Sequence, residues 1–301
     1  MNLYADYKPQ LTMSDKKTEQ ENFEIIIKPN RSWFYIDWQG LLHYKDLLLL
    51  LVKRDFVVRY KQTILGPLWF IIQPLLMTLV FTVIFGTVAK LPTDGVPPML
   101  FYLCGLLAWT YFANCLTTTS TSFVDNAYLF GKVYFPRIVV PLSVIISNLF
   151  AFAIQLATFL AFFVYFKYFT AAGVLIQPNL FILLLPLILI QTAFLALGFG
   201  LWLSALTAKY RDLTFLMGFL IQMWMYATPI IYPVSMIPKE WQYIAFLNPM
   251  ASIVESWKYA FFGTGVVELN YLLISAAVTV FVLLTGIFVF NRAERTFIDT
   301  V

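Results

Sequence analysis

Six long apolar segments without a single ionisable side chain are the feature that most constrains this chain. A helix needs about 20 largely apolar residues to cross the hydrocarbon core of a bilayer. The segments are Leu68–Ala89, Met99–Phe123, Ile138–Phe166, Pro178–Leu206, Leu213–Tyr232 and Tyr271–Phe290. Only 12% of all residues are charged, against about 25% in a soluble domain, so lipid is the expected solvent. The sequence therefore predicts an all-α integral membrane protein with six transmembrane helices.

Basic residues are unevenly distributed between the loops on the two sides of these segments. One side would carry Lys53, Arg54, Arg59, Lys61, Lys132, Arg137, Lys209, Arg211, Arg292 and Arg295, and the other only Lys90, Lys167, Lys239 and Lys258. Cytoplasmic loops are enriched in Lys and Arg, so both termini are predicted in the cytoplasm of a multi-pass protein. The net charge of +4 is mild and does not indicate a nucleic-acid partner.

The region before the first span divides into two parts. Residues 1–30 are polar and of mixed charge, which predicts a flexible cytoplasmic tail. Residues 31–67 contain Leu41–Gln62, which is apolar in its middle and charged at both ends. We expect an amphipathic helix along the inner leaflet, although a buried helix of a small cytoplasmic domain is an alternative. Gly66-Pro67 would end it and turn the chain into the membrane domain, residues 68–301.

The segment Pro233–Leu269 between the last two spans is amphipathic and rich in aromatic residues. It is broken at Asn248-Pro249, and neither half is long enough to cross a bilayer. Two short re-entrant helices that dip into the outer leaflet are predicted, with a small extracellular subdomain as the alternative. The carboxylates Glu240, Glu255 and Glu268 are scattered and are attributed to helix ends and solvated surface.

The chain offers no energy source of its own. Ion-coupled transporters place ionisable groups inside the membrane bundle, and the six spans have none. A nucleotide-binding P-loop needs a glycine five residues before its Gly-Lys pair and a hydroxyl residue after it. Around Gly131-Lys132 these positions hold Asn126 and Val133. No nucleophile–base pair indicates an enzyme, so active transport would need a separate ATPase subunit.

Asp125–Arg137, between spans two and three, is the predicted docking segment for that subunit. Exposed aromatic residues and arginines are favoured at protein interfaces. The expected exposed anchors are Tyr128, Phe130, Tyr134 and Phe135. A loop that rests on lipid headgroups remains an alternative for this segment.

Aromatic and polar residues within the spans are candidates for a substrate path. The aromatic candidates on spans one and five are Trp69, Phe81, Phe85, Trp224, Tyr226 and Tyr232. Flat aromatic faces suit the apolar C–H faces of sugar rings, and the amides of Asn148, Gln155 and Gln222 can hydrogen-bond a passing sugar. Packing between helices explains the amides equally well, and packing against lipid explains each aromatic residue at least as well.

Four motifs in a fixed order carry a resemblance to a known family. They are "KRDFVVRYKQTILGPLW", "YLFGKVYFPR", "IPKEWQYIAFLNPM" and "NRAERTFIDTV". Together with six spans, they resemble the permease subunit of ABC-type polysaccharide exporters, the type-two permeases that export O-antigen, capsule and teichoic acid. The likeness extends from about Lys28 to Val301, and the segment before span one looks most like O-antigen exporters of Gram-negative bacteria.

This resemblance implies a homodimer in the bacterial inner membrane, with two copies of a P-loop ATPase subunit that binds ATP and magnesium; this chain itself would hold no cofactor or metal. The cargo would be a polysaccharide linked to undecaprenyl diphosphate, moving between spans one and five of the two protomers. Leu47–Lys61 and Asp125–Arg137 would contact the ATPase. The implied coupling residues are Tyr128, Phe130, Lys132, Tyr134, Phe135 and Arg137, and the candidate diphosphate partners are Arg54, Arg59 and Lys61.

Three other functions remain at this point. A type-two permease for a small drug or a lipid would share the same spans and the same motor. A membrane enzyme acting on polyprenyl-linked sugars would work without an ATPase. A structural membrane scaffold would need neither substrate nor motor.

Overall fold

The computed structural model describes residues 38–61, 63–130, 132 and 135–298. The chain divides into two units, Met1–Ser32 and Trp33–Val301, of which the first lies outside the described residues, as does the predicted tail 1–30. Every regular element in the described part is a helix. This confirms the all-α prediction for that part of the chain.

Five helices are long and apolar enough to cross a membrane. They are Gly66–Val88, Pro98–Ser120, Val139–Phe169, Leu180–Lys209 and Leu269–Glu294. Their ends lie within four residues of the predicted spans. The sixth predicted span, Leu213–Tyr232, contains α9, a helix of 14 residues that ends at Tyr226. At 1.5 Å per residue it is about 21 Å long and shorter than the hydrocarbon core.

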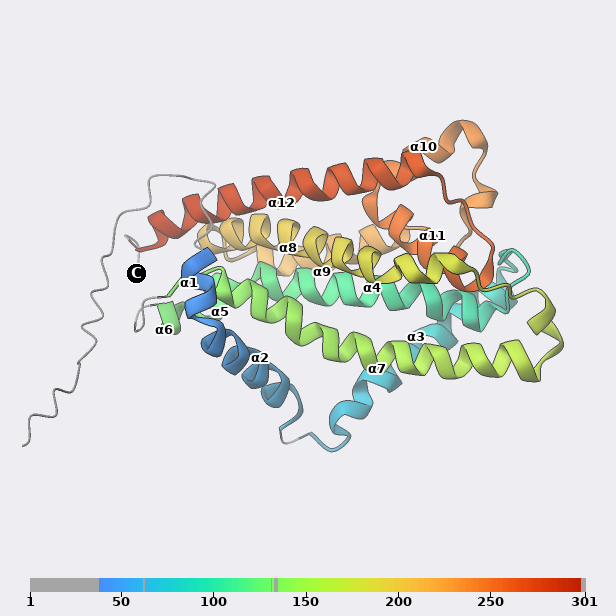
Figure 1. The fold of residues 1–301 in the computed structure, drawn as a ribbon, viewed down its shortest axis with the longest axis horizontal. Helices are drawn as coiled ribbons and strands as arrows, with labels where there is room; N and C mark the ends of the chain where they lie inside the picture. Colours follow the sequence, from blue (N-terminus) through green and yellow to red (C-terminus); the bar gives the residue numbers. More distant parts are fainter. Residues whose placement is uncertain (1–37, 62, 131, 133–134, 299–301) are drawn as a thin grey trace, which may run out of the picture. The chain divides into compact units, whose positions relative to one another are not determined.

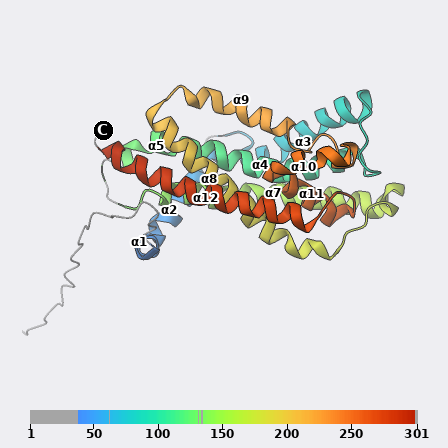
Figure 2. The same ribbon diagram turned by 90° about the horizontal axis from the view of Figure 1, so that it is seen from above.

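The long helices run side by side (Figures 1 and 2). The first span consists of a short 3-10 turn, Gly66–Leu68, then α3 and a π-helical stretch, Thr82–Val88. The other long helices are α4, α7, α8 and α12. The bounds of these four helices, and of α3 and α9, are Trp69–Phe81 for α3, Pro98–Ser120 for α4, Val139–Phe169 for α7, Leu185–Lys209 for α8, Leu213–Tyr226 for α9 and Leu269–Ile298 for α12.

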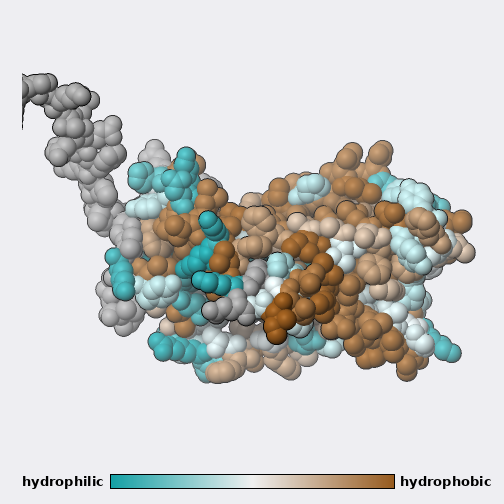
Figure 3. Space-filling view, turned by 90° about the horizontal axis from the view of Figure 1, so that it is seen from below, coloured by the Kyte–Doolittle hydropathy of each residue, from teal (hydrophilic) through white to brown (hydrophobic). Residues whose placement is uncertain are grey.

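Short helices gather at the two ends of this bundle (Figure 1). One end, hereafter the α6 end, carries α1 (Trp38–His43), α5 (Ser122–Asp125) and α6 (Ala127–Phe130). The opposite end, hereafter the α10 end, carries α10 (Lys239–Leu247) and α11 (Pro249–Phe262). Figure 3 shows apolar residues over the middle of one face and hydrophilic residues near both ends, as expected of a chain that spans a bilayer.

The core is centred on α4. This helix packs against α7, α8, α3 and α11. Of an apolar stretch of 18 residues within it, 78% is buried. Helix α8, which packs on α4, packs in turn closely against α12. A Cβ atom on Gly198 would lie 2.8 Å from the backbone of Leu283, so only glycine permits this crossing. Small residues at crossings bring membrane helices close enough for extensive van der Waals contact.

Helix α2, Lys45–Tyr60, diverges from the bundle at the α6 end (Figure 1). One side of it packs on α7, where Leu51 joins Phe135, Val139 and Val140 in a small buried cluster. The other side leaves apolar residues such as Leu49, Leu50 and Val58 exposed. Helix α2 thus has both a protein-facing and a free apolar side. Gly66, with φ of +49°, turns the chain into the first span, where a residue with a Cβ would be strained.

Candidate functional site

The predicted docking segment Asp125–Arg137 forms the surface of the α6 end. Tyr128 and Lys132 are exposed, whereas Gly131, Val133 and Tyr134 lie outside the described residues. Phe130 is half-buried and stacks near Phe123 and Phe135. The expectation of exposure is wrong for Phe135, which is 5% exposed and belongs to the cluster under α2. A candidate interface here consists of Tyr128 and Lys132, supported from below by Phe130 and Phe135.

Arg137 ties this segment to the end of α12. Its Nη1 donates to the backbone oxygen of Glu294 at 3.2 Å, and its Nε lies 3.7 Å from the Glu294 carboxylate. Its guanidinium also lies over the Phe130 ring, 5.2 Å from the centroid. The side chain is 9% exposed. Arg137 therefore acts inside the protomer, where it joins two segments far apart in sequence.

Arg54 lies at a polar junction between α2, the docking segment and α7. Its Nη2 donates to Asp55 Oδ1 at 2.8 Å and to Asn126 Oδ1 at 3.2 Å. Ser143 Oγ on α7 donates to Asp55 Oδ2 at 3.5 Å. Of the other two candidate diphosphate partners, Lys61 is exposed and the side chain of Arg59 lies outside the described residues. Of the two candidates whose side chains are described, Lys61 is therefore the more open to an anionic headgroup.

The aromatic candidates on spans one and five separate into two groups. Trp69 and Tyr226 are exposed, and Phe85 and Tyr232 are half-buried. Phe81 is 3% exposed and packs against Tyr102 of α4. The Trp224 ring packs against Phe112 of α4 and Phe199 of α8, with ring centroids 5.0 Å apart in both cases. The structure thus places Phe81 in the core of the protomer and packs the half-buried Trp224 against that core, and the channel role of both stays a prediction.

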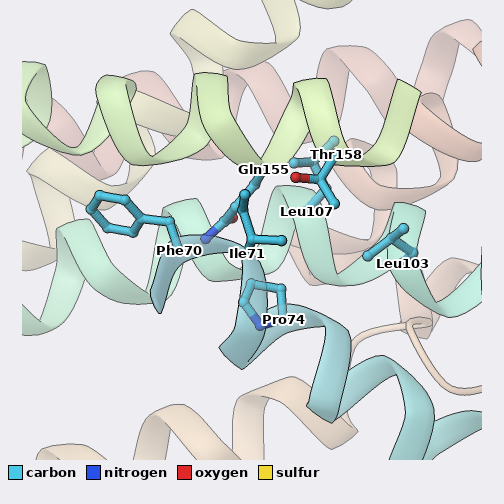
Figure 4. A pocket seen from close by; sticks show the side chains of 7 residues that line it. All are labelled: Phe70, Ile71, Pro74, Leu103, Leu107, Gln155 and Thr158. Carbon is cyan, nitrogen blue, oxygen red and sulfur yellow. The ribbon is translucent and has the colours of Figure 1, made fainter. Parts of the chain in front are cut away.

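A small pocket lies between α3, α4 and α7 (Figure 4). Its volume is about 10 Å³, and its lining residues are Phe70, Ile71, Pro74, Leu103, Leu107, Gln155 and Thr158. Thr110 Oγ1 donates to Gln155 Oε1 at 2.8 Å. Such a volume holds about one water molecule and no sugar ring. The Gln155 amide thus packs between helices of one protomer.

The α10 end contains an ion pair that we did not expect from the sequence. Glu255 and Lys258 lie one turn apart on α11, with Lys258 Nζ 3.2 Å from Glu255 Oε1 and side chains 1% and 2% exposed. The attribution of Glu255 to solvated surface is therefore wrong. Each ion is thus buried with the other as its counter-ion, which offsets part of the cost of removing both from water. Opposite charges three residues apart in "ASIVESWKYAFF" were the available signal.

Comparisons with known proteins agree with this architecture. The family model for ABC-2 type transporters matches residues 46–262. An O-antigen export system permease protein RfbA from Klebsiella pneumoniae is 32% identical over 84% of this chain and 94% of that protein. RfbA from Myxococcus xanthus is 30% identical over 87% and 97%. The polysialic acid transport protein KpsM from Escherichia coli is 25% identical over 83% and 94%.

The matched region runs from α2 through the end of α11, so it includes both ends of the bundle and four of the five long spans. The RfbA proteins are covered almost end to end. This chain therefore belongs to the ABC-2 type transporter family of membrane permeases.

Proposed function

We propose that this chain is the permease subunit of an ATP-driven exporter that moves undecaprenyl-diphosphate-linked polysaccharide, of the O-antigen class, across the bacterial inner membrane. The observation that carries the proposal is the 32% identity to an O-antigen export permease over 84% of this chain and 94% of that protein. The five long apolar helices and the family match support a transmembrane transport role.

The motor in this proposal is a pair of separate P-loop ATPase subunits, which bind ATP and magnesium. They dock at the α6 end, on Tyr128 and Lys132 and on the free side of α2. Arg137 supports this assignment because its contacts with Glu294 and Phe130 connect the docking segment to α12. A movement of the docking segment, caused by the ATPase, would be transmitted to α12 through the contacts of Arg137. In this arrangement both termini lie in the cytoplasm.

The proposed exporter contains two copies of this chain, which meet along the first span and α9. Only 11% of an apolar stretch of 18 residues within Gly66–Val88 is buried within the protomer. Most of α9 is exposed as well, including Phe215, Phe219 and Met223. Figure 2 shows α9 and the first span on the same side of the bundle. Trp69 and Tyr226 would line the path between the copies, with α9 in the fifth membrane crossing and α10 and α11 as re-entrant helices between the fifth and sixth crossings.

Lys61, and Arg59 beside it, would meet the diphosphate of the carrier lipid at the inner leaflet. Juxtamembrane cations attract anionic headgroups through their charge. Arg54 contributes to the same region indirectly, because its guanidinium holds Asp55 and Asn126 together.

A gene deletion tests the proposed function. We expect the deletion strain to accumulate lipid-linked polymer inside the cell, to display none at the surface, and to recover with the restored gene. A P-loop ATPase should co-purify with the intact chain. Normal surface polymer in the deletion strain would contradict the proposal, as would loss of a small drug's or a lipid's export with polymer unaffected.

A further inference from the structure

Helix α9 ends before the predicted span does, and the non-helical residues that follow it carry backbone carbonyl groups that need hydrogen-bond donors. The helix ends at Tyr226, and Ala227–Tyr232 continue without helical structure. The last carbonyls of any helix lack intrahelical partners. Pro229 adds to this because it has no N–H and cannot continue a helix. Where an interrupted helix lies at membrane depth, other parts of the protein must bond its free carbonyls.

Asn248, at the start of α11, provides part of that bonding. Its Nδ2 donates to Ala227 O at 3.3 Å and to Thr228 Oγ1 at 2.9 Å. Its Oδ1 accepts from the backbone N–H of Met250 at 3.1 Å and from Trp224 Nε1 at 2.9 Å. One amide thus uses donors and acceptors together to join the last turn of α9, the residues after it and the N-terminus of α11.

Lys258, on α11, donates to a second carbonyl of this connection. Its Nζ donates to Pro229 O, and it lies 3.9 Å from the centroid of the Phe101 ring on α4. Glu255 accepts from Lys258 through Oε1 and from the backbone N–H of Val266 through Oε2, at 3.1 Å. The pair therefore connects four places: the end of α9, α4, α11 and the connection to α12.

The charges are not needed to make this region stable. A buried ion pair gains little over well-packed apolar side chains of similar volume, because both ions must lose their hydration. A methionine and a glutamine would fill the same space at lower desolvation cost. What the charges add is geometric: an ammonium held by a carboxylate fixes a bare backbone carbonyl in one position.

We propose that Asn248 and Lys258 are positioning residues for export, which bind the broken end of α9 so that α9 and α11 move as one unit. This inference rests on the function proposed above: the bond to Asn248 keeps the half-buried Trp224 packed against the core, while Tyr226, two residues later, stays exposed toward the substrate path. Glu255 holds the Lys258 ammonium in place. The arrangement assigns Lys258 a role in transmitting movement from α9 to the α10 end rather than in contacting the polymer.

The test uses the complete exporter, this chain with its ATPase, in cells and in reconstituted vesicles. We expect Lys258→Met to lower polymer exported per ATP hydrolysed by at least about tenfold at equal amounts of assembled complex. Lys258→Arg, which keeps a cation and its donors, should recover most of the ratio. Asn248→Ala should lower it as well. Lys239→Met, at an exposed lysine of the same end, is the matched control and should leave the ratio unchanged.

The ratio separates positioning from folding, since a misfolded fraction lowers export and ATP hydrolysis together. If Lys258→Met does not assemble, the double variant Glu255→Gln with Lys258→Met removes both charges and restores assembly. Export per ATP at the wild-type ratio in that double variant would overturn the proposal, and so would a ratio in Lys258→Met equal to that of Lys239→Met. Failure of the proposed function is distinct, because the wild-type complex would then export no lipid-linked polymer.

Discussion

The ion pair Arg54–Asp55 at the α6 end and the ion pair Glu255–Lys258 at the α10 end differ in burial and in what else they bind. At the α6 end, Arg54 and Asp55 pair with each other, and their own side chains are 30% and 20% exposed. Their further partners are also side chains, such as that of Asn126. At the α10 end, Glu255 and Lys258 are nearly inaccessible and bind backbone groups of two connections. An exposed pair can rearrange when a partner docks, whereas a buried pair holds the backbone in one geometry. The two ends are thus suited to different parts of a transport cycle.

Arg137 lies between these extremes. Its side chain is nearly buried, while that of its partner Glu294 is 31% exposed. If burial determines how much a charge contributes to stability, three substitutions should rank in the order of burial. A fourth, at an exposed aromatic residue, should affect assembly without affecting stability.

The largest effect is expected for Lys258→Met. Loss of the ammonium leaves the Glu255 carboxylate buried without its cation, which should lower the free energy of unfolding by about 3–5 kcal/mol. Denaturant unfolding of the purified chain in detergent measures this. The double variant Glu255→Gln with Lys258→Met should recover most of the loss. A single variant as stable as the wild type would show that the buried pair does not hold the α10 end.

A smaller loss is expected for Arg137→Met, about 1.5–3 kcal/mol, because a charged donor leaves the Glu294 carbonyl and the Phe130 ring. Arg211→Met, at an exposed arginine, serves as the control. The same unfolding measurement applies. An effect of Arg137→Met no larger than that of the control would place Arg137 with the exposed charges.

For Arg54→Ala we expect a loss of at most about 1 kcal/mol, since partly exposed pairs are screened by water. Raising the salt concentration to about 1 M shortens the screening length to about 3 Å and should reduce the difference from wild type further. A loss comparable to that of Lys258→Met, unchanged by salt, would remove the contrast between the two ends.

The smallest change in stability is expected for Tyr128→Ala, within about 0.5 kcal/mol, because the side chain is exposed. Co-purification of the ATPase should nevertheless fall, since aromatic anchors contribute much of the binding energy at interfaces. Tyr168→Ala, an exposed tyrosine at the far end of α7, should leave co-purification unchanged. Equal ATPase recovery with both variants would exclude Tyr128 from the docking surface.

Much of the fold could be predicted because lipid imposes a simple rule on the chain. Five of the predicted spans are helices whose ends differ from the prediction by at most four residues. The break at Asn248-Pro249 also separates two short helices, as expected. The predicted span Leu213–Tyr232 fared less well, since its helix ends at Tyr226. Hydropathy continues through "ATPIIY", and the available signal for the end of that helix was Pro229, which cannot continue it.

The candidate site was harder to predict because lipid and a protein core favour the same side chains. Gly66–Val88 and Pro98–Ser120 are both apolar and both 23 residues long. Yet within the protomer, 11% of an 18-residue stretch of Gly66–Val88 is buried, against 78% of the corresponding stretch of Pro98–Ser120. Phe81 and Phe135 cannot be told in sequence from exposed aromatic residues, yet both are buried. Glu255 and Lys258 looked like surface charges because their partners, Pro229 and Val266, are backbone groups brought close only by folding.

By itself, the sequence determined that this chain is helical and spans a membrane, because a backbone in lipid must bond to itself and long uncharged segments leave no other choice. It also determined family membership through motifs whose order is legible without a structure. Only the tertiary structure decided which apolar faces are core, which stay free for a partner, and which charges are buried. Those outcomes depend on contacts between residues distant in the chain, and no local pattern of hydropathy records them.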